Sequence, residues 1–279
     1  MTQHFTHQTA ADFSLSLTLY GAEHFGPSPC LVYVHGFKGF KDWAFVPYAG
    51  EFFANRGYAF LCFNFSHNGI GPDGETFTEL DRFEQNTFLL EVSELQEVIK
   101  LVAHTNQLGA DLHAPLGIIG HSRGGGIALL TSQQQPEVQA VATWASVSTF
   151  ERYPHDTLEA WKAQGYLEVS NARTGQIMRL GKPILQEIER YGRSRLNILQ
   201  AAQQFSRPLL ILHGEQDETV PPFEAEQLNI YGDPDHTTLR LIPQTGHTFG
   251  AKHPFDGSNP ALDQVLTATA DFFDLHLRQ

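Results

Sequence analysis

The chain has 279 residues and a formal net charge of −13, with 41% hydrophobic and 18% charged residues, as folded globular proteins have. The acidic balance argues against nucleic acid or an anionic membrane surface as a partner, because both bind basic surfaces. No apolar run approaches the roughly 18 residues of a membrane helix. The first residues also lack the basic start and apolar core of a signal peptide. We therefore expect no membrane span and a cytoplasmic location.

Short apolar runs predict the strands. Residues before position 15, which include His4 and His7, are expected to form a solvated tail. Residues 15–20 alternate apolar and polar side chains with period two, as an outer strand does. The later runs are continuous and fit strands covered on both faces, as in a parallel sheet. They span residues 30–34, 58–65, 116–119, 138–147, 208–212 and 238–242. The two cysteines, Cys30 and Cys62, lie in these runs and are expected to be buried, reduced thiols.

Amphipathic stretches between the runs predict helices. Residues 83–105 place apolar side chains at three- and four-residue spacing, and residues 43–56 end before Gly57. Further helices are expected over residues 124–134, 221–230 and 261–277. Strands that alternate with helices of this length predict an α/β fold with a doubly wound, mostly parallel sheet flanked by helices.

One segment, residues 150–205, interrupts the alternation because it holds no long apolar strand. We expect it to contain a hairpin that pairs residues 166–169 with residues 176–180. Helical stretches are expected around this hairpin, at residues 157–164, 184–191 and 196–205. The prediction is therefore a core of residues 1–149 and 206–279, with residues 150–205 inserted over one end of the sheet as a lid.

The pattern G-x-S-x-G occurs at Gly120-His121-Ser122-Arg123-Gly124, after a predicted strand and before a predicted helix. A chain that reverses so sharply strains its central residue, and glycines on both sides avoid collisions. Ser122 would also lie at a helix N-terminus, where developing negative charge is stabilised. This context predicts a nucleophile, whereas the alternative is an ordinary serine in a glycine-rich turn.

A serine hydroxyl needs a base, and the base needs an orienting acid. His247 follows the last predicted strand and Asp217 follows the strand before it. Both should emerge with Ser122 at the carboxyl edge of the sheet, where open α/β sheets bind ligands. Alternatives for the base and the acid lie nearby, namely His253, Glu215 and Glu218.

An acyl-transfer site also needs an oxyanion hole, in which each N–H donor lowers the barrier by roughly 3 kcal/mol. One donor is expected to be the backbone N–H of Arg123, directly after the serine. The other is expected from Phe37, in the loop His35-Gly36-Phe37-Lys38-Gly39 that follows residues 30–34. The alternative for this loop is a plain glycine turn.

These motifs give the chain a resemblance to the α/β-hydrolase superfamily. The chain carries HGFKG, GHSRGG, HGEQDETVP and GHTF, which begin at residues 35, 120, 213 and 246. These motifs follow one another in the order that is typical of the superfamily. HGFKGFKDW, NFSHNG and the hairpin near NARTG also resemble bacterial serine esterases and dienelactone-hydrolase-like proteins. Dienelactone hydrolases proper use a cysteine nucleophile, whereas this chain has Ser122.

The resemblance implies acyl transfer by a Ser122–His247–Asp217 triad without a metal or organic cofactor. The expected partner is a small-molecule ester, with small or medium acyl or aryl esters favoured. A thioesterase, acyltransferase or peptidase could use the same triad, so these activities stay open. A non-catalytic binding module is the remaining alternative.

Overall fold

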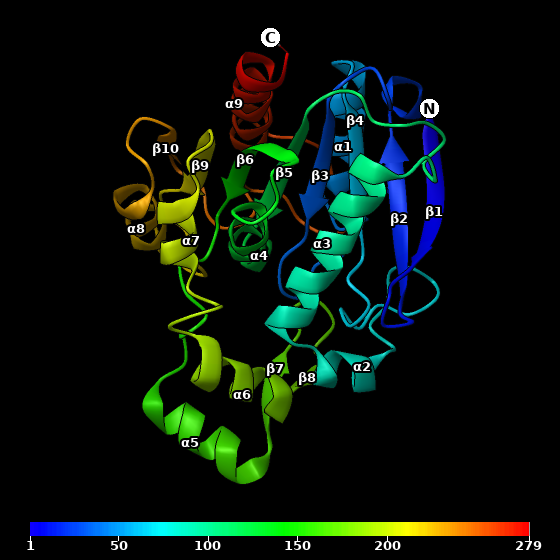
Figure 1. Ribbon diagram of the computed structural model, residues 1–279. Helices are drawn as coiled ribbons and strands as arrows, with labels where there is room; N and C mark the ends of the chain where they lie inside the picture. Colours follow the sequence, from blue (N-terminus) through cyan, green and yellow to red (C-terminus); the bar gives the residue numbers. More distant parts are fainter. Residues whose placement is uncertain (279) are drawn as a thin grey trace.

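The computed structural model describes residues 1–278 and is built on a central eight-stranded sheet (Figure 1). The strand order is β1-β2-β4-β3-β5-β6-β9-β10. Its strands are β1 (Thr2–Gln8), β2 (Ser14–Tyr20), β3 (Cys30–Val34), β4 (Ala59–Phe63), β5 (Leu116–His121), β6 (Val138–Trp144), β9 (Leu209–Gly214) and β10 (Thr237–Ile242). From β4 to β10 all neighbours pair in parallel, whereas β1 and β2 are antiparallel. The predicted mostly parallel sheet is confirmed.

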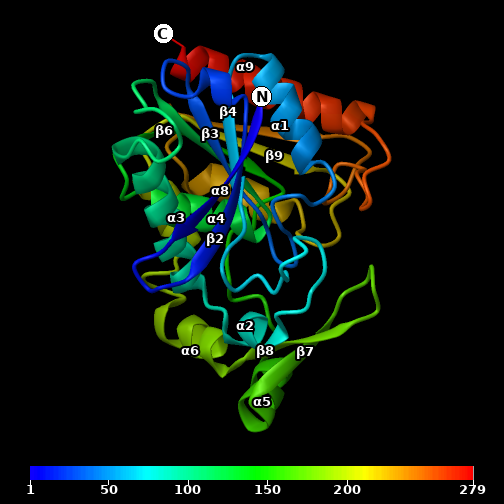
Figure 2. The ribbon, with the colours of Figure 1, turned by 90° about the vertical axis from the view of Figure 1, so that its right-hand side faces the viewer.

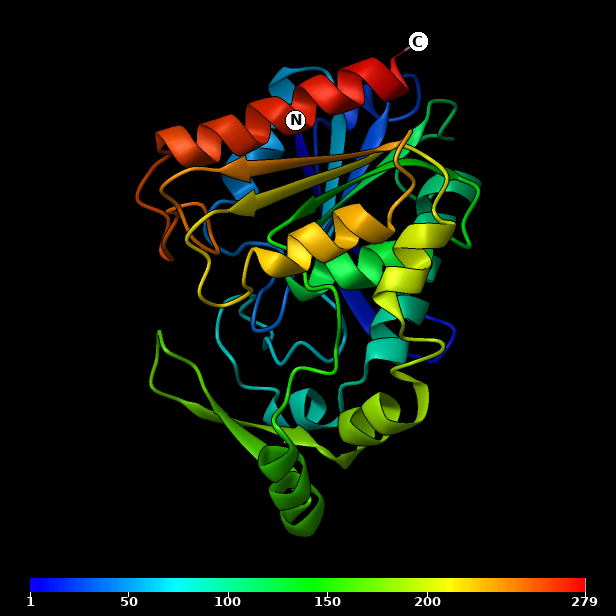
Figure 3. The same cartoon turned by 90° about the vertical axis from the view of Figure 1, so that its left-hand side faces the viewer.

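Helices cover both faces of the sheet (Figure 3). One face carries α1 (Val46–Asn55) and α9 (Pro260–Leu277), and the other carries α3 (Phe88–His104), α4 (Arg123–Ser132) and α8 (Phe223–Tyr231). Side chains of a strand alternate between the faces. In β3, therefore, Val32 and Val34 join one buried cluster while Leu31 and Tyr33 join the other. Burial on both faces explains why the inner strands read as continuous apolar runs.

The N-terminal residues form an edge strand, so the predicted solvated tail is wrong. β1 pairs with β2 in antiparallel register over its whole length. His4 Nδ1 lies 3.1 Å from the Thr18 hydroxyl of that neighbour. Because most side chains of β1 are exposed, its sequence is polar and carries little strand signal.

The helix expected over residues 83–105 is two helices, α2 (Leu80–Gln85) and α3. Asn86 and Thr87 between them have extended backbones, and the Thr87 side chain caps α3 by accepting the Leu90 N–H at 3.2 Å. A threonine cap of this kind starts a new helix. The apolar spacing continues across the break and hides it.

Part of the segment between β6 and β9, from α5 to α6, lies below the main body in Figure 1. The elements in this segment are α5 (His155–Gln164), β7 (Tyr166–Ser170), β8 (Ile177–Gly181), α6 (Lys182–Tyr191) and α7 (Ile198–Gln204). β7 and β8 pair antiparallel with Glu168 opposite Arg179, which confirms the predicted hairpin. Figure 2 shows this hairpin under the body beside α2, which it contacts through β8. α7 packs on α4 and α8 of the core.

Two further findings concern residues 1–278 as a whole. None of the helices described has both the length and the apolar character that crossing a bilayer requires. Cys30 and Cys62 are buried free thiols, as expected.

Candidate active site

Ser122 occupies the sharp turn between β5 and α4. Its backbone has φ 56° and ψ −122°, a conformation that non-glycine residues rarely adopt. The turn also brings backbones into close contact. A Cβ atom at Gly120 would lie 2.5 Å from the Gly124 carbonyl oxygen, and one at Gly124 would lie 2.2 Å from that of Val34. Only glycine fits at these two positions, so the G-x-S-x-G pattern has a steric cause.

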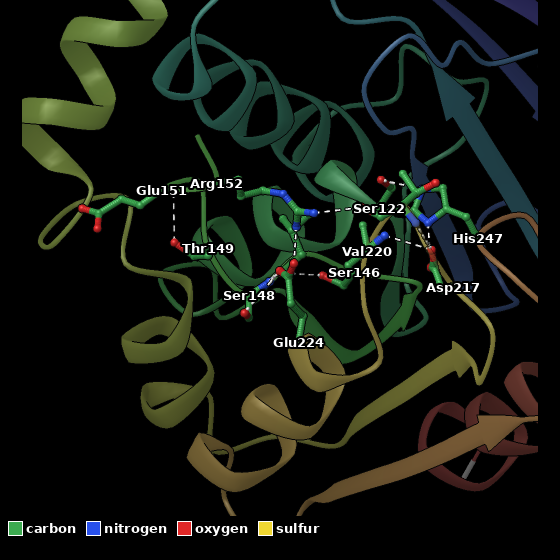
Figure 4. A network of polar contacts seen from close by, with 12 residues as sticks. Ser122, Ser146, Ser148, Thr149, Glu151, Arg152, Asp217, Val220, Glu224 and His247 are labelled. Carbon is green, nitrogen blue, oxygen red and sulfur yellow. Dashed lines mark hydrogen bonds and ion pairs between the residues drawn. The ribbon is translucent and has the colours of Figure 1, made fainter. Parts of the chain in front are cut away.

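The structure brings the three residues Ser122, His247 and Asp217 into one hydrogen-bonded chain (Figure 4). His247 Nδ1 lies 2.8 Å from Asp217 Oδ2, and His247 Nε2 lies 2.9 Å from Ser122 Oγ. Because an ionised carboxylate only accepts hydrogen bonds, Nδ1–H donates to Asp217. Nε2 is then left to accept the serine proton, as a general base must.

The alternative residues lie elsewhere. His253 accepts the Ala44 N–H through Nδ1 at 3.0 Å, and its Nε2 lies 3.6 Å from Glu75. Glu215 and Glu218 are exposed, whereas Asp217 between them is 3% exposed. The geometry therefore favours His247 and Asp217 over these neighbours.

Asp217 is held by three groups besides His247. The N–H groups of Thr219 and Val220 each donate to its Oδ1 at 2.9 Å. Nε2 of the fully buried His213 lies 2.8 Å from the Val220 carbonyl oxygen and 3.3 Å from Asp217 Oδ2. Burial opposes ionisation of Asp217, but hydrogen bonds from His213 and His247 outweigh it and hold its pKa below the usual range. Sequence reasoning missed His213, whose signal is the His-Gly pair that ends β9.

His121, beside the serine, fixes the loop that carries His247. Its Nε2–H donates to the His247 carbonyl oxygen at 3.0 Å. Burial, and secondarily the charge that His247 can carry, lower the pKa of His121 to about 3. His121 therefore stays neutral at physiological pH and acts as a hydrogen-bond donor.

The loop after β3 passes directly against the serine. A Cβ atom at Gly36 would lie 2.8 Å from Ser122 Cβ and 3.4 Å from its Oγ. His35 braces this loop, because its Nδ1–H donates to the Gly36 carbonyl oxygen at 3.0 Å while its Nε2 accepts the Phe65 N–H at 3.3 Å. Burial lowers the pKa of His35 to about 4, which keeps it in this neutral form.

The backbone N–H groups of Phe37 and Arg123 are the expected oxyanion donors. Within residues 1–278, neither of them donates a hydrogen bond to another protein group. Both residues line the same cavity as Ser122. Two N–H groups without a protein acceptor thus belong to residues of the cavity wall.

The cavity encloses about 470 Å³, a size typical of small-molecule sites. Aromatic and aliphatic side chains make up much of its wall, among them Phe37, Phe40, Phe88, Val147 and Phe150. Asn171, Ala172 and Arg173 of the β7–β8 hairpin also line it. Throughout residues 1–278, no three His, Cys, Asp or Glu side chains are grouped to hold a metal ion.

We compared the sequence with models of known protein families and with curated proteins. The prolyl oligopeptidase family matches residues 43–254, a range that contains Ser122, Asp217 and His247. No curated protein matches the chain.

Several solved structures share the fold at low sequence identity. Est1E from Butyrivibrio proteoclasticus, solved with bound ferulic acid, is 17% identical over 99% of this chain and 100% of its own, with a TM-score of 0.71. The α/β-hydrolase GrgF from Penicillium sp. sh18 is 16% identical over 100% of both chains, with a TM-score of 0.73. Mouse α/β-hydrolase domain-containing protein 10 is 18% identical over 98% and 99%, with a TM-score of 0.74.

Proposed function

The chain belongs to the prolyl oligopeptidase family and is a hydrolase with the α/β-hydrolase fold, and on that premise we propose that it cleaves small carboxylic esters through an acyl-enzyme intermediate. One observation carries the proposal, namely the continuous chain of hydrogen bonds from Ser122 through His247 to Asp217. Such a chain activates a hydroxyl that is otherwise a weak nucleophile at neutral pH.

In the first half-reaction, Ser122 Oγ attacks the ester carbonyl carbon while His247 Nε2 takes the hydroxyl proton. Asp217 stabilises the imidazolium cation that forms. The N–H groups of Phe37 and Arg123 stabilise the oxyanion of the tetrahedral intermediate. The dipole of α4, which begins at Arg123, adds to this effect.

The intermediate collapses as the alcohol leaves with the proton that His247 returns, and the acyl group stays on Ser122. Water then attacks the acyl-enzyme, with His247 again acting as the base. The second tetrahedral intermediate breaks down to the free carboxylic acid and restores the serine hydroxyl.

Small or medium acyl and aryl groups fit the site best. The cavity volume of about 470 Å³ lies within the range of small-molecule sites. Its aromatic lining, with Phe37, Phe88 and Phe150, favours apolar groups.

We further propose that residues 150–205 act as a lid inserted into a core of residues 1–149 and 206–279. The support is the hairpin tip, because Asn171 to Arg173 line the cavity together with Ser122. Deleting residues 172–174 should raise KM for a small ester more than it lowers kcat, and an unchanged KM would argue against a lid.

A peptidase is the second candidate, because the matching family is one of oligopeptidases. The same serine can attack an amide carbonyl, which is less reactive than an ester carbonyl. The amine then leaves, and the acyl group stays on the serine. The two candidates differ in substrate and not in the proposed triad.

A substrate panel separates these activities. We would measure kcat/KM for p-nitrophenyl acetate, butyrate and octanoate, for an acyl-CoA, and for a peptide p-nitroanilide, with Ser122→Ala as the control. The short-chain esters should be hydrolysed fastest, and Ser122→Ala should hydrolyse none of them. Turnover of the anilide alone would favour the peptidase, and turnover of the CoA thioester alone would favour a thioesterase.

A further inference from the structure

The cavity beside Ser122 is unusually cationic for a chain with a net charge of −13. Four cationic side chains line it, and of residues 1–278 no Asp or Glu does. These cations are Lys38, Arg123, Arg152 and Arg173.

Two of the four are already neutralised by carboxylates outside the lining. Arg123 pairs with Glu91 at 3.3 Å, and both side chains are nearly buried. Arg152 forms an ion pair with Glu224, which Figure 4 shows close to it. These pairs leave little net charge for a ligand.

Lys38 and Arg173 differ, because neither forms an ion pair within the described part of the chain. Lys38 Nζ donates to the Ser170 carbonyl oxygen at 2.8 Å, and Arg173 Nη2 donates to the Lys38 carbonyl oxygen at 3.4 Å. These contacts join the loop after β3 to the hairpin. The carboxylate that most affects Arg173 is that of Glu75, which is exposed and lies 3.6 Å from His253 Nε2.

The fold thus holds two like charges close enough to affect each other, and among the described residues neither is in an ion pair. Burial lowers the pKa of Lys38, and the charges of Arg173 and Arg123 lower it further. The Arg173 guanidinium lies over the rings of Phe40 and Phe77, at 5.7 and 5.8 Å from their centroids. An anionic ligand would offset the repulsion between the two cations.

The side chain of Asn171, on the hairpin beside Arg173, carries a buried hydrogen-bond donor without a partner. Asn171 is buried at 2% exposure, and its Oδ1 accepts the Arg173 N–H at 3.2 Å. That bond leaves Nδ2 as a buried donor with no partner among the described residues. Buried amide donors without a partner are uncommon, and this one belongs to a residue that lines the cavity.

We propose that Lys38, Asn171 and Arg173 form a subsite for a carboxylate on the substrate, so that the preferred ester is anionic. All three present hydrogen-bond donors, and cationic donors bind carboxylates more strongly than neutral ones do. The inference rests on the proposed function, because Ser122 is the residue that would cleave this ester.

The distance between the subsite and Ser122 limits the length of the substrate. Lys38 is two residues beyond Gly36, where an added Cβ atom would lie 3.4 Å from Ser122 Oγ. Two extended residues span about 7 Å at most. The Lys38 side chain adds several ångströms to this span, so we infer that the carboxylate and the ester belong to one small substrate, as in a hemiester of a short dicarboxylic acid or in an acylated hydroxybenzoate.

Two matched pairs of esters test the subsite and show which side of the ester carries the charge. p-Nitrophenyl hydrogen glutarate is compared with p-nitrophenyl butyrate for the acyl side, and 4-(butyryloxy)benzoate with phenyl butyrate for the alcohol side. The readout is the ratio of kcat/KM for the charged ester to that for the neutral ester. At least one ratio should exceed ten in the wild type.

Lys38→Met and Arg173→Gln should each lower that ratio about tenfold, the effect of losing one charge-assisted hydrogen bond. Arg179→Gln is the matched control, because Arg179 lies on the same hairpin but is 48% exposed and pairs with Glu168 at 3.6 Å. It should leave the ratio unchanged. Wild-type ratios near one, or ratios that neither variant lowers, would overturn the proposal.

A binding experiment distinguishes failure of the carboxylate subsite from failure of the proposed esterase function. Calorimetry on Ser122→Ala with monomethyl glutarate and with dimethyl glutarate measures affinity without turnover. The monoanion should bind at least tenfold more tightly, and Arg173→Gln in the same background should remove the difference. Equal affinities would refute the subsite, whereas an absence of hydrolysis of every ester by the wild type would refute the esterase proposal alone.

Discussion

The hydroxyl oxygen of Ser122 lies 2.9 Å from Nε2 of His247, although 125 positions separate the two residues along the chain. The parallel strands bring them together, because Ser122 follows β5 and the loop with His247 follows β10 at the same edge of the sheet. His121 then ties the two loops through its bond to the His247 carbonyl oxygen. The base is therefore held in place before any substrate binds, which lowers the entropic cost of reaction.

Asp217→Asn should lower kcat by roughly 10³- to 10⁴-fold, because an amide NH₂ facing Nδ1 favours the wrong tautomer of His247. Ester hydrolysis under saturating substrate measures this effect. Glu218→Gln is the matched control on the same loop and should retain wild-type activity. Equal losses in the two variants would mean that the carboxylate at position 217 has no special role.

Gly36→Ala should lower kcat by roughly a hundredfold or more, the effect of misplacing one oxyanion donor. The added methyl group would lie 2.8 Å from Ser122 Cβ, so the loop with the Phe37 N–H must shift. Thermal unfolding should show that the variant still folds cooperatively. A folded variant with wild-type kcat would show that this loop supplies no donor.

Glu94 gives the stability of the protein a specific dependence on pH. Burial raises its pKa to about 7, against the hydrogen bonds from Ser66. Between an unfolded pKa of about 4.3 and this value, the folded state binds a proton that the unfolded state lacks. The contribution of Glu94 to the free energy of unfolding therefore falls as pH rises through this window, whereas His35 and His121, with lowered pKa values, contribute in the opposite sense.

Glu94→Gln should remove that fall and stabilise the protein by roughly 1–3 kcal/mol at pH 8, with less effect at pH 5. Urea unfolding of both proteins at the two pH values measures the difference. The prediction is wrong if the stability difference between them is the same at pH 5 and pH 8.

Most of the fold could be predicted because local patterns agree with tertiary burial. The inner strands are apolar throughout, and the glycines around Ser122 are needed on steric grounds. β1 could not be found, because an exposed edge strand needs few apolar side chains. The break at Asn86 and Thr87 was hidden because the apolar spacing runs through it.

The proposed triad residues could be named from the sequence because each follows a recognisable strand. The contacts that hold these residues in place could not be predicted from the sequence. His213 was missed because only the folded loop shows its position beside Asp217 and Val220. The approach of Arg173 to Lys38 joins residues 135 positions apart and depends on where the hairpin lies.

Labelling with a fluorophosphonate tests the central claim most directly, because this reagent reacts with a serine only when a base activates it. Peptide mapping of the labelled wild type should find one modified residue, Ser122, and Ser122→Ala should stay unlabelled. Ser66→Ala is the matched control, since Ser66 Oγ also lies 2.7 Å from a histidine, at Nδ1 of His67, yet Ser66 does not line the cavity. It should label like the wild type. An unreactive wild type, or equal labelling of Ser122→Ala, would contradict the account.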